Sequence, residues 1–574
     1  MRAARPSATL AATFPTRQVS PMPPRLRARL LRVLSLLSIL AVAACGGGEE
    51  AAGPAPPAPE TGPRLAVDCS GPHCGAIDAH RYAGSGVGVW QYTNDTDDRV
   101  EVSVRIDGIP GKDVHLSYVN HSDTRQKLPP LELFLRSPYT GTAALLRAAA
   151  PAPARAGLPR PHAPYDLRAL PRPRAKTASG PALARMAASA SHRVGDTREW
   201  WVNDFSGGDN ARAPRPTTLR RRSSLDGADR RALNIWVEDA VTAAGVITDE
   251  ALDQLQERIR STYDRITRIA GPIWAETPYE NIIGAHEDLN VVIVEPLEVL
   301  GYVNFTDAYV RHYYPDFPNI QQSNEALAVY MHARSIYAPD DVYTDAIQTF
   351  SHELTHLIFW FYRGILAGDD DQLDSWLNET VAEAMKELAY HPDDAAPSDT
   401  EARFQSWLSW GQRGGFNCDL RDMYPIPLPN RACYGYSTVN ALAAFLMRHY
   451  GADLLVSLLH DFSSSDSFEI LDHSLRQAGG DGFPALLRRF GTSAALFPAA
   501  ASPPGFGYPA RHGQDVFLIP LDGARYADIN TLPGRVPLYL EPYGFFPFVR
   551  PLVQGSYRET LLVPPRSSLS LVIR

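Results

Sequence analysis

The segment Asp345-Ala-Ile-Gln-Thr-Phe-Ser-His-Glu-Leu-Thr-His-Leu-Ile-Phe-Trp360 decides the fold of this chain. His352 and His356 are four residues apart, so an α-helix places both imidazoles on one face, one turn apart. Two neutral imidazole nitrogens in this arrangement hold one Zn²⁺ at about 2.0–2.1 Å. Glu353 lies beside the same site and is predicted to be the general base that takes a proton from zinc-bound water. Apolar residues that flank the motif predict a buried, rigid helix: Ile347, Phe350, Leu354, Leu357, Ile358 and Phe361.

A zinc site of this kind needs a third protein ligand. Glu379 follows in Trp376-Leu-Asn-Glu-Thr-Val-Ala-Glu-Ala-Met-Lys-Glu387, which has the pattern of a second helix. This segment resembles the gluzincins, the thermolysin-like zinc metallopeptidases. The resemblance implies that Glu379 is the third ligand, that Asn378 supports His356 and that Glu383 accepts a hydrogen bond from His352. The family usually has Asp where this chain has Glu383. The alternative interpretation, without the family, is that the two histidines are core or surface residues of an amphipathic helix and that Glu379 and Glu383 are solvent-facing acids.

A narrower resemblance is to the hyicolysin-type neutral metallopeptidases, and it spans roughly residues 195–450. It rests on Gly195-Asp-Thr-Arg-Glu-Trp-Trp-Val202, Asn234-Ile-Trp-Val-Glu-Asp239, Ser323-Asn-Glu325 and the Asn-Glu helix. A metzincin site is excluded, because Leu357 to Asp371 contains no third histidine.

In gluzincins a downstream Tyr or His stabilises the oxyanion. The resemblance therefore points to Cys433-Tyr-Gly-Tyr-Ser-Thr438, ahead of a helix expected at Val439–Tyr450. Tyr436 is the preferred candidate and Tyr434 the second, with a packed or turn tyrosine as the alternative. His449 is interpreted as structural, and Asp369-Asp-Asp371 as a solvated loop rather than a Ca²⁺ site.

These residues predict a zinc-dependent endopeptidase that acts on protein or peptide substrates. One alternative is a zinc-binding surface lipoprotein with an adhesion or binding role. Another is an aminopeptidase of the same zinc group, for which Ser323-Asn-Glu325 is the one hint of a site for a substrate amino terminus. The apolar strand Asn324–His332 is expected either to be an edge strand that pairs with the substrate backbone or to be buried and structural.

Export is predicted from the first 45 residues, in which arginines precede an apolar run that ends at Val42-Ala-Ala-Cys-Gly46. This resembles the lipobox of bacterial lipoproteins and implies a lipid anchor at Cys45 on the outer membrane or cell surface, with release as an alternative. An ordinary secretory signal is the other interpretation. The remaining cysteines favour disulfides Cys69–Cys74 and Cys418–Cys433, although four cysteines allow three pairings. The net charge of −9 argues against a nucleic-acid binder.

The expected fold class is α+β, with several domains in 574 residues. Strand-like runs at 65–137 predict a small β-sandwich-like domain, with a turn at Gly108-Ile-Pro-Gly111 between two strands. The catalytic domain, with a mixed sheet, the zinc helix and a helical subdomain in the zincin manner, is expected at 195–495. The full division is a signal at 1–45, a tether at 46–64, the β domain at 65–137, a Pro/Ala-rich linker at 138–194, the catalytic domain, and a separate β-rich segment at 496–574.

Overall fold

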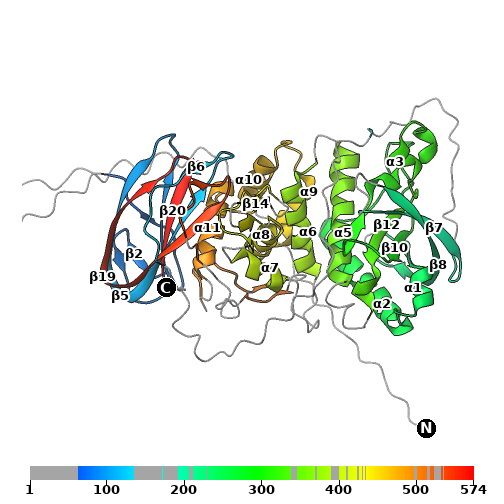
Figure 1. Cartoon of the computed structure of the whole chain (residues 1–574), viewed down its shortest axis with the longest axis horizontal. Coiled ribbons are helices and arrows are strands. Elements are labelled where there is room, and N and C mark those ends of the chain that lie inside the picture. Colours follow the sequence, from blue (N-terminus) through cyan, green and yellow to red (C-terminus); the bar gives the residue numbers. More distant parts are fainter. Residues whose placement is uncertain are drawn as a thin grey trace, which may run out of the picture. The chain divides into compact units, whose positions relative to one another are not determined.

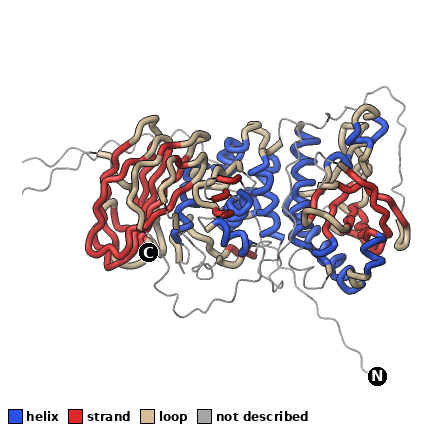
Figure 2. Tube along the Cα trace, viewed as in Figure 1, coloured by secondary structure: helices blue, strands red, loops and turns tan. Residues whose placement is uncertain are grey.

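The structure, a computed structural model, describes residues 62–134, 171, 192–205, 211–227, 229–337, 346–368, 372–389, 400–408, 412–422, 426–428, 431–433, 435–496, 501–513, 517–521, 532–533 and 535–574. The signal segment 1–45, most of the tether and nearly all of the linker 138–194 lie outside these residues. The α+β class is confirmed by the described residues, which form three sheets of three or more strands and helices that pack on sheets (Figures 1 and 2).

A six-stranded mixed sheet lies beside the helix that carries the two histidines (Figure 1). Its central strand β10 is parallel to β9 and β12, whereas the outer strands β11, β8 and β7 are antiparallel to their neighbours. In spatial order the strands are β11 (Gly301–Val303), β12 (Leu327–His332), β10 (Leu289–Val294), β9 (Arg231–Glu238), β8 (Arg212–Leu225) and β7 (Thr197–Asn203).

The two faces of this sheet separate because successive side chains of a strand point to opposite sides. Ile235 and Val291 face the main apolar core beneath the helices, whereas Trp236 and Val292 join a smaller cluster on the other face. The covering helices are α1 (Asp239–Ala244), α2 (Asp249–Ala270) and α5 (Ile347–Phe359). Thr248 starts α2, because its hydroxyl accepts a hydrogen bond from the amide of Ala251.

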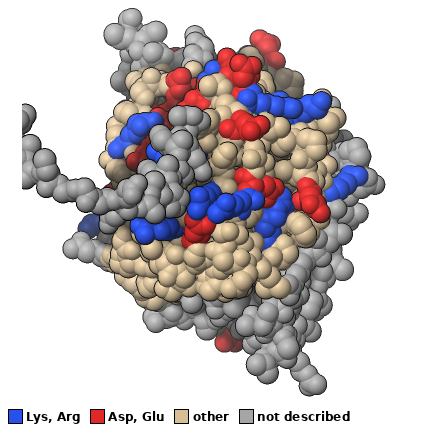
Figure 3. Space-filling view, turned by 90° about the vertical axis from the view of Figure 1, so that its left-hand side faces the viewer, with Lys and Arg blue, Asp and Glu red and all other residues tan. Residues whose placement is uncertain are grey.

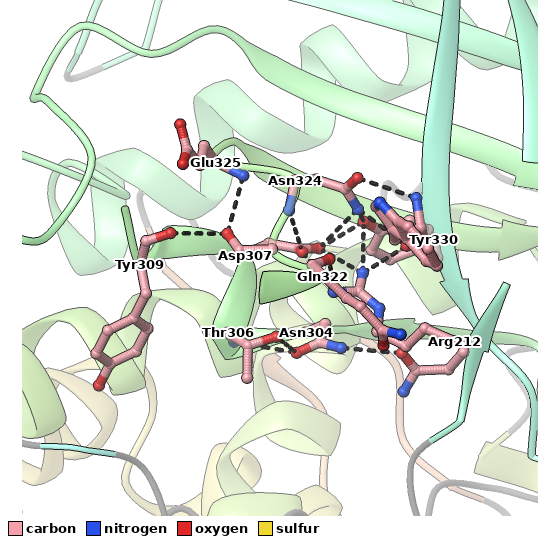
Figure 4. A network of polar contacts seen from close by, with 12 residues as sticks. Arg212, Asn304, Thr306, Asp307, Tyr309, Gln322, Asn324, Glu325 and Tyr330 are labelled. Carbon is pink, nitrogen blue, oxygen red and sulfur yellow. Dashed lines mark hydrogen bonds and ion pairs between the residues drawn. The ribbon is translucent and has the colours of Figure 1, made fainter. Parts of the chain in front are cut away.

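A buried polar network holds the loop before β12 against β8 (Figure 4). Arg212 donates to Asp307 at 2.9 Å, and each side chain is 3% exposed. The side-chain amide of Asn324 donates to the Tyr330 hydroxyl at 2.6 Å and to the carbonyl of Trp201 at 2.9 Å. Ser323 and Asn324 of the Ser323-Asn-Glu325 motif are therefore buried and used in packing, whereas Glu325 is half-buried and pairs with Arg311 at 3.1 Å.

Helices follow α5 in the chain and pack together beside it (Figures 1 and 2). A π-helical segment, η6 (Trp360–Ala367), continues α5 directly. The buried guanidinium of Arg363 in this segment donates hydrogen bonds to the carbonyls of Leu458 and Asp461. Both carbonyls lie at the carboxyl end of α9, where Asp461 is the C-cap residue. The helices that follow are α6 (Ser375–Ala389), α7 (Thr400–Trp407), α8 (Gly435–His449), α9 (Ala452–His460), α10 (Ser467–Gln477) and α11 (Phe483–Ser493). A short helix, α3 (Pro318–Gln321), precedes β12.

Short helical turns and small sheets complete this region. The turns are η2 (Phe305–Ala308), η3 (Arg311–Tyr313), η4 (Ala333–Ile336) and η8 (Ala494–Leu496). The small sheets contain β13 (Gln412–Gly414), β14 (Ile426–Leu428) and β15 (Arg431–Cys433), and the pair β16 (Arg511–His512) and β17 (Phe517–Leu518). Within the described residues no single helix is long and apolar enough to cross a membrane. Only α8 and α9 together, bent by 111°, pass such a test, by length and composition.

Strands from residues 66–120 and 545–573 form one seven-stranded sheet, so the prediction of separate β domains at 65–137 and 496–574 is wrong. Strand β20 lies between β4 and β5. Strand β19 pairs with β5 along almost its whole length, and both are labelled in Figure 1. The strands are β1 (Ala66–Val67), β2 (Ala76–Asp78), β3 (Arg81–Tyr82), β4 (Gly88–Asn94), β5 (Val100–Asn120), β19 (Phe545–Val563) and β20 (Ser567–Ile573). A short pair, β6 (Gln126–Lys127) with β18 (Tyr539–Leu540), also joins the segments that follow β5 and precede β19.

The predicted turn at Gly108-Ile-Pro-Gly111 is also wrong, because β5 runs through it as one strand. Both glycines have positive φ, 90° and 69°, so the segment bends the strand without ending it. Helix α11 packs on this sheet, where Gly491 leaves room for Val119 and Phe545, and Arg488 pairs with Asp68 at 3.1 Å. Acidic and basic side chains are interspersed on the face shown in Figure 3, and no single sign of charge dominates it.

Candidate metal centre

Helices α5 and α6 bring the predicted ligands together. His352 and His356 lie one turn apart on α5, and Glu379 lies in the first turns of α6, which packs directly against α5. All three side chains are buried. One ligand atom from each lies within 4.8 Å of the other two, which makes a group able to hold a metal ion.

The separations within this group match those of a tetrahedral zinc site. The Nε2 atoms of His352 and His356 are 3.0 Å apart. Glu379 places Oε2 at 3.1 Å from Nε2 of His352 and Oε1 at 3.7 Å from Nε2 of His356. Two ligand atoms bound tetrahedrally at about 2.0–2.1 Å lie roughly 3.3 Å apart. The nitrogen and oxygen donors and their spacing therefore fit Zn²⁺.

The far nitrogen of each histidine has a polar partner, as the resemblance implied. Nδ1 of His356 lies 3.3 Å from Oδ1 of Asn378, and Nδ1 of His352 lies 3.2 Å from Oε1 of Glu383. An acceptor at Nδ1 holds the proton there and leaves Nε2 unprotonated for a metal. The longer Glu383, in place of the usual Asp, still reaches His352.

The electrostatics of the group favour a positive charge at its centre. Burial alone would lower the pKa of His352, but hydrogen bonds to Glu379 and Glu383 outweigh burial and raise this pKa to about 10. Burial would raise the pKa of Glu379, and the neighbouring His356 and His352 instead hold it well below its usual range. A buried group of side chains that stabilises a proton in this way also stabilises a bound cation.

Tyr436 reaches the same centre from the first turn of α8. Its hydroxyl lies 3.0 Å from Nε2 of His352 and donates to Oε2 of Glu379. Burial, reinforced by Glu379 and Glu383, raises the pKa of Tyr436 well above its usual value, so the phenol stays protonated and remains a donor. Tyr436 belongs to helix α8 itself, although it was expected in a segment ahead of the helix, and Tyr434 lies outside the described residues.

Glu353 follows His352 on α5 and packs against β11. A Cβ atom at Gly301 would lie 3.5 Å from Cγ of Glu353 and 2.4 Å from Cγ2 of Thr349, so only glycine lets this strand come so close. The edge of the sheet is β11, not Asn324–His332, because β12 is paired on both sides along Val329–Met331. Of the two interpretations of this segment, the edge strand is wrong and the buried structural strand is confirmed, because every residue of β12 is buried.

Glu383 has three further partners that sequence reasoning missed. Its carboxylate accepts from Arg403 of α7 at 2.6 Å, from Lys386 at 2.7 Å and from Asn440 of α8 at 2.5 Å. Burial would raise the pKa of Glu383, but Arg403 and Lys386 hold it well below its usual range. Asn440 is four residues after Tyr436, so this spacing could have predicted that both side chains lie on one face of a helix. No spacing in the sequence connects Arg403 with the other residues of the site.

Both predicted disulfides are present. Cys433 of the Cys418–Cys433 disulfide lies three residues before Tyr436, which is in the first turn of α8. The Cys69–Cys74 disulfide lies in the loop between β1 and β2. Nε2 of His449 lies 3.0 Å from the carbonyl of Gly507, which supports the structural interpretation of that histidine. The acidic run 369–371 lies outside the described residues.

A family model described as peptidase M30 matches residues 209–574, and a second, described as a domain of unknown function, matches residues 67–133. No curated protein matches the chain. Among solved structures, the chain is similar to an M1 zinc metallopeptidase from Deinococcus radiodurans, with 12% identity and a TM-score of 0.28. That similarity covers 55% of this chain and 64% of the other, so this chain spans less than two thirds of the other's length. The M30 match includes β19 and β20, whose partner strands lie in the second matched region.

Proposed function

The chain belongs to the peptidase M30 family and is a metallopeptidase, and on this premise we propose that it is a zinc-dependent endopeptidase acting on extracytoplasmic proteins. The observation that carries the proposal is the buried group of His352, His356 and Glu379, with ligand atoms within 4.8 Å of one another. Glu353 and Tyr436 flank this group from α5 and α8.

The residues around this group take separate roles in peptide hydrolysis. When bound, zinc polarises the scissile carbonyl and makes water more acidic. Glu353 accepts a proton from the attacking water and delivers it to the nitrogen of the leaving amine. The neutral hydroxyl of Tyr436 turns from Glu379 toward the oxyanion as negative charge develops on it. Asn378 and Glu383 hold the two imidazoles in the tautomer that keeps Nε2 unprotonated.

The assignment to the gluzincin group is part of this proposal. It is supported by the order of the elements: a helix with both histidines, a second helix with Glu379, and a downstream tyrosine. The short antiparallel edge strand β11, beside Glu353, is suited to pair with an extended substrate backbone. An adhesion protein that only keeps zinc would not need Glu353 and Tyr436 beside the ligands, so the catalytic interpretation is preferred.

We further propose that the protein is exported and anchored through a lipid on Cys45. Two disulfides in the described residues support an oxidising compartment. The anchor itself falls in residues that the structure does not describe. Labelling with a radioactive fatty acid, compared between the natural chain and Cys45→Ser, tests it, and equal labelling of both would contradict it.

Peptides with blocked termini separate the endopeptidase from the aminopeptidase. We expect the zinc-loaded protein to cleave a peptide that is acetylated at its amino terminus and amidated at its carboxyl end. Product masses should show cleavage at internal bonds. If only free amino termini are processed, one residue at a time, the endopeptidase proposal is wrong and the aminopeptidase alternative takes its place.

A further inference from the structure

Arg403 contacts two parts of the candidate centre at once. Its Nη1 atom donates to Oε1 of Glu383 at 2.6 Å, and the same oxygen lies 3.2 Å from Nδ1 of His352. Its guanidinium carbon lies 4.5 Å from the centre of the Tyr436 ring. One planar cation therefore touches both the partner of a zinc ligand and the proposed oxyanion donor.

The contact with the tyrosine ring constrains where the hydroxyl points. Tyr436 is 2% exposed, and the Arg403 side chain is 18% exposed, so the pair is largely shielded from water. A guanidinium stacked on an aromatic face is attracted by the ring quadrupole and limits the tilt of the ring. The Tyr436 hydroxyl must lie within hydrogen-bond distance of the oxyanion, and displacement by about 1 Å lowers the rate strongly.

Glu383 fixes the guanidinium in turn. Its carboxylate is fully buried and links α6 to three other helices, through His352 on α5, Arg403 on α7 and Asn440 on α8. The single carboxylate of Glu383 therefore contacts both α5, which carries the histidines, and α8, which carries Tyr436.

We propose that Arg403 is a positioning residue, which sets the orientation of Tyr436 relative to the zinc ligands through its ion pair with Glu383. This inference rests on the proposed function, because it gives Tyr436 a role in the reaction. Arg403 acts through the tyrosine and does not touch the reacting atoms.

The test is a double-mutant cycle between Arg403→Met and Tyr436→Phe, with kcat, KM and zinc affinity measured for each protein. Arg403→Met should lower kcat about tenfold through misplacement of the hydroxyl, with KM and zinc affinity nearly unchanged. Arg403→Lys should recover part of the loss. In the Tyr436→Phe background, which has the ring but no hydroxyl, Arg403→Met should change kcat less than about twofold.

Arg550→Met is the matched control. Arg550 also pairs with a carboxylate, Glu559 at 2.7 Å, and its guanidinium lies 5.2 Å from the Phe548 ring, in strand β19 of the seven-stranded sheet. This variant should keep full kcat. If Arg403→Met lowers kcat equally in both backgrounds, or lowers zinc affinity in step with kcat, the positioning role is wrong.

A second measurement does not depend on activity. In protein labelled with 3-fluorotyrosine, the ¹⁹F resonance that disappears in Tyr436→Phe belongs to Tyr436. This resonance should shift or broaden in Arg403→Met and stay unchanged in Arg550→Met. An unchanged resonance in Arg403→Met would overturn the inference. Absence of any cleavage by the zinc-loaded natural protein would instead count against the proposed function.

Discussion

Replacement of Tyr436 by phenylalanine removes one hydroxyl from the proposed site and leaves the ring in place. The ring keeps its contacts with Arg403 and with the helix that carries it. The hydroxyl lies 3.0 Å from Nε2 of His352, and burial keeps its pKa well above the ordinary value. A neutral donor at such a position contributes about 2.7–4 kcal/mol to the transition state, so kcat should fall by about 10²–10³-fold.

Initial-rate assays on a blocked fluorogenic peptide, with zinc measured on the same samples, test this prediction. KM should change little and the zinc content should stay at that of the natural protein, because all three ligands remain. Tyr508→Phe is the control. The buried Tyr508 hydroxyl donates a hydrogen bond at 3.2 Å to the carbonyl of Ala441, which lies on α8, the helix that also carries Tyr436. A fall in kcat of less than about fivefold in Tyr436→Phe would refute the oxyanion role of the hydroxyl.

Three further predictions concern stability, each followed by urea unfolding. Replacing both Cys418 and Cys433 by serine should cost about 3 kcal/mol, because their bond closes a loop of 15 residues, and unchanged stability would contradict this. Asp307→Asn leaves the guanidinium of Arg212 buried without its charged partner and should cost about 3–5 kcal/mol; a loss below about 1 kcal/mol would mean that water reaches the pair. Burial lowers the pKa of His449 to about 4, so below pH 6.5 the unfolded chain binds a proton that the folded chain does not. Stability should therefore fall by about 1.4 kcal/mol per pH unit from pH 6.5 to 4, and His449→Gln should remove that part of the acid loss. Equal acid loss in both proteins would contradict the buried neutral imidazole.

The centre of the site could be predicted from the sequence because its geometry is local. His352, Glu353 and His356 lie on one helix, where spacing alone determines which side chains share a face. Glu379 needed the resemblance to a family, since the packing of α6 on α5 is a tertiary contact. The pairing of the four cysteines followed from their closeness along the chain.

Long-range pairing explains the errors. β20 inserts between β4 and β5, more than 400 residues away in the chain, and no local pattern in either segment indicates this partner. The alternation of apolar and polar residues in β5 predicted strands there. The two glycines within it, however, bend one continuous strand and do not form a turn between two strands. The role of Arg403 could not be predicted from the sequence for the same reason. Its contacts come from helices that pack beside α7, and no local pattern around Arg403 indicates them.

The most direct test of the central claim compares the natural protein with Glu353→Gln. Both proteins should hold about one zinc per chain, as a mononuclear site requires, since Glu353 is not a ligand. Only the natural protein should cleave casein, because glutamine cannot accept the proton from water. Zinc binding without cleavage by either protein would contradict the peptidase mechanism, and absence of zinc from both would contradict the metal centre itself.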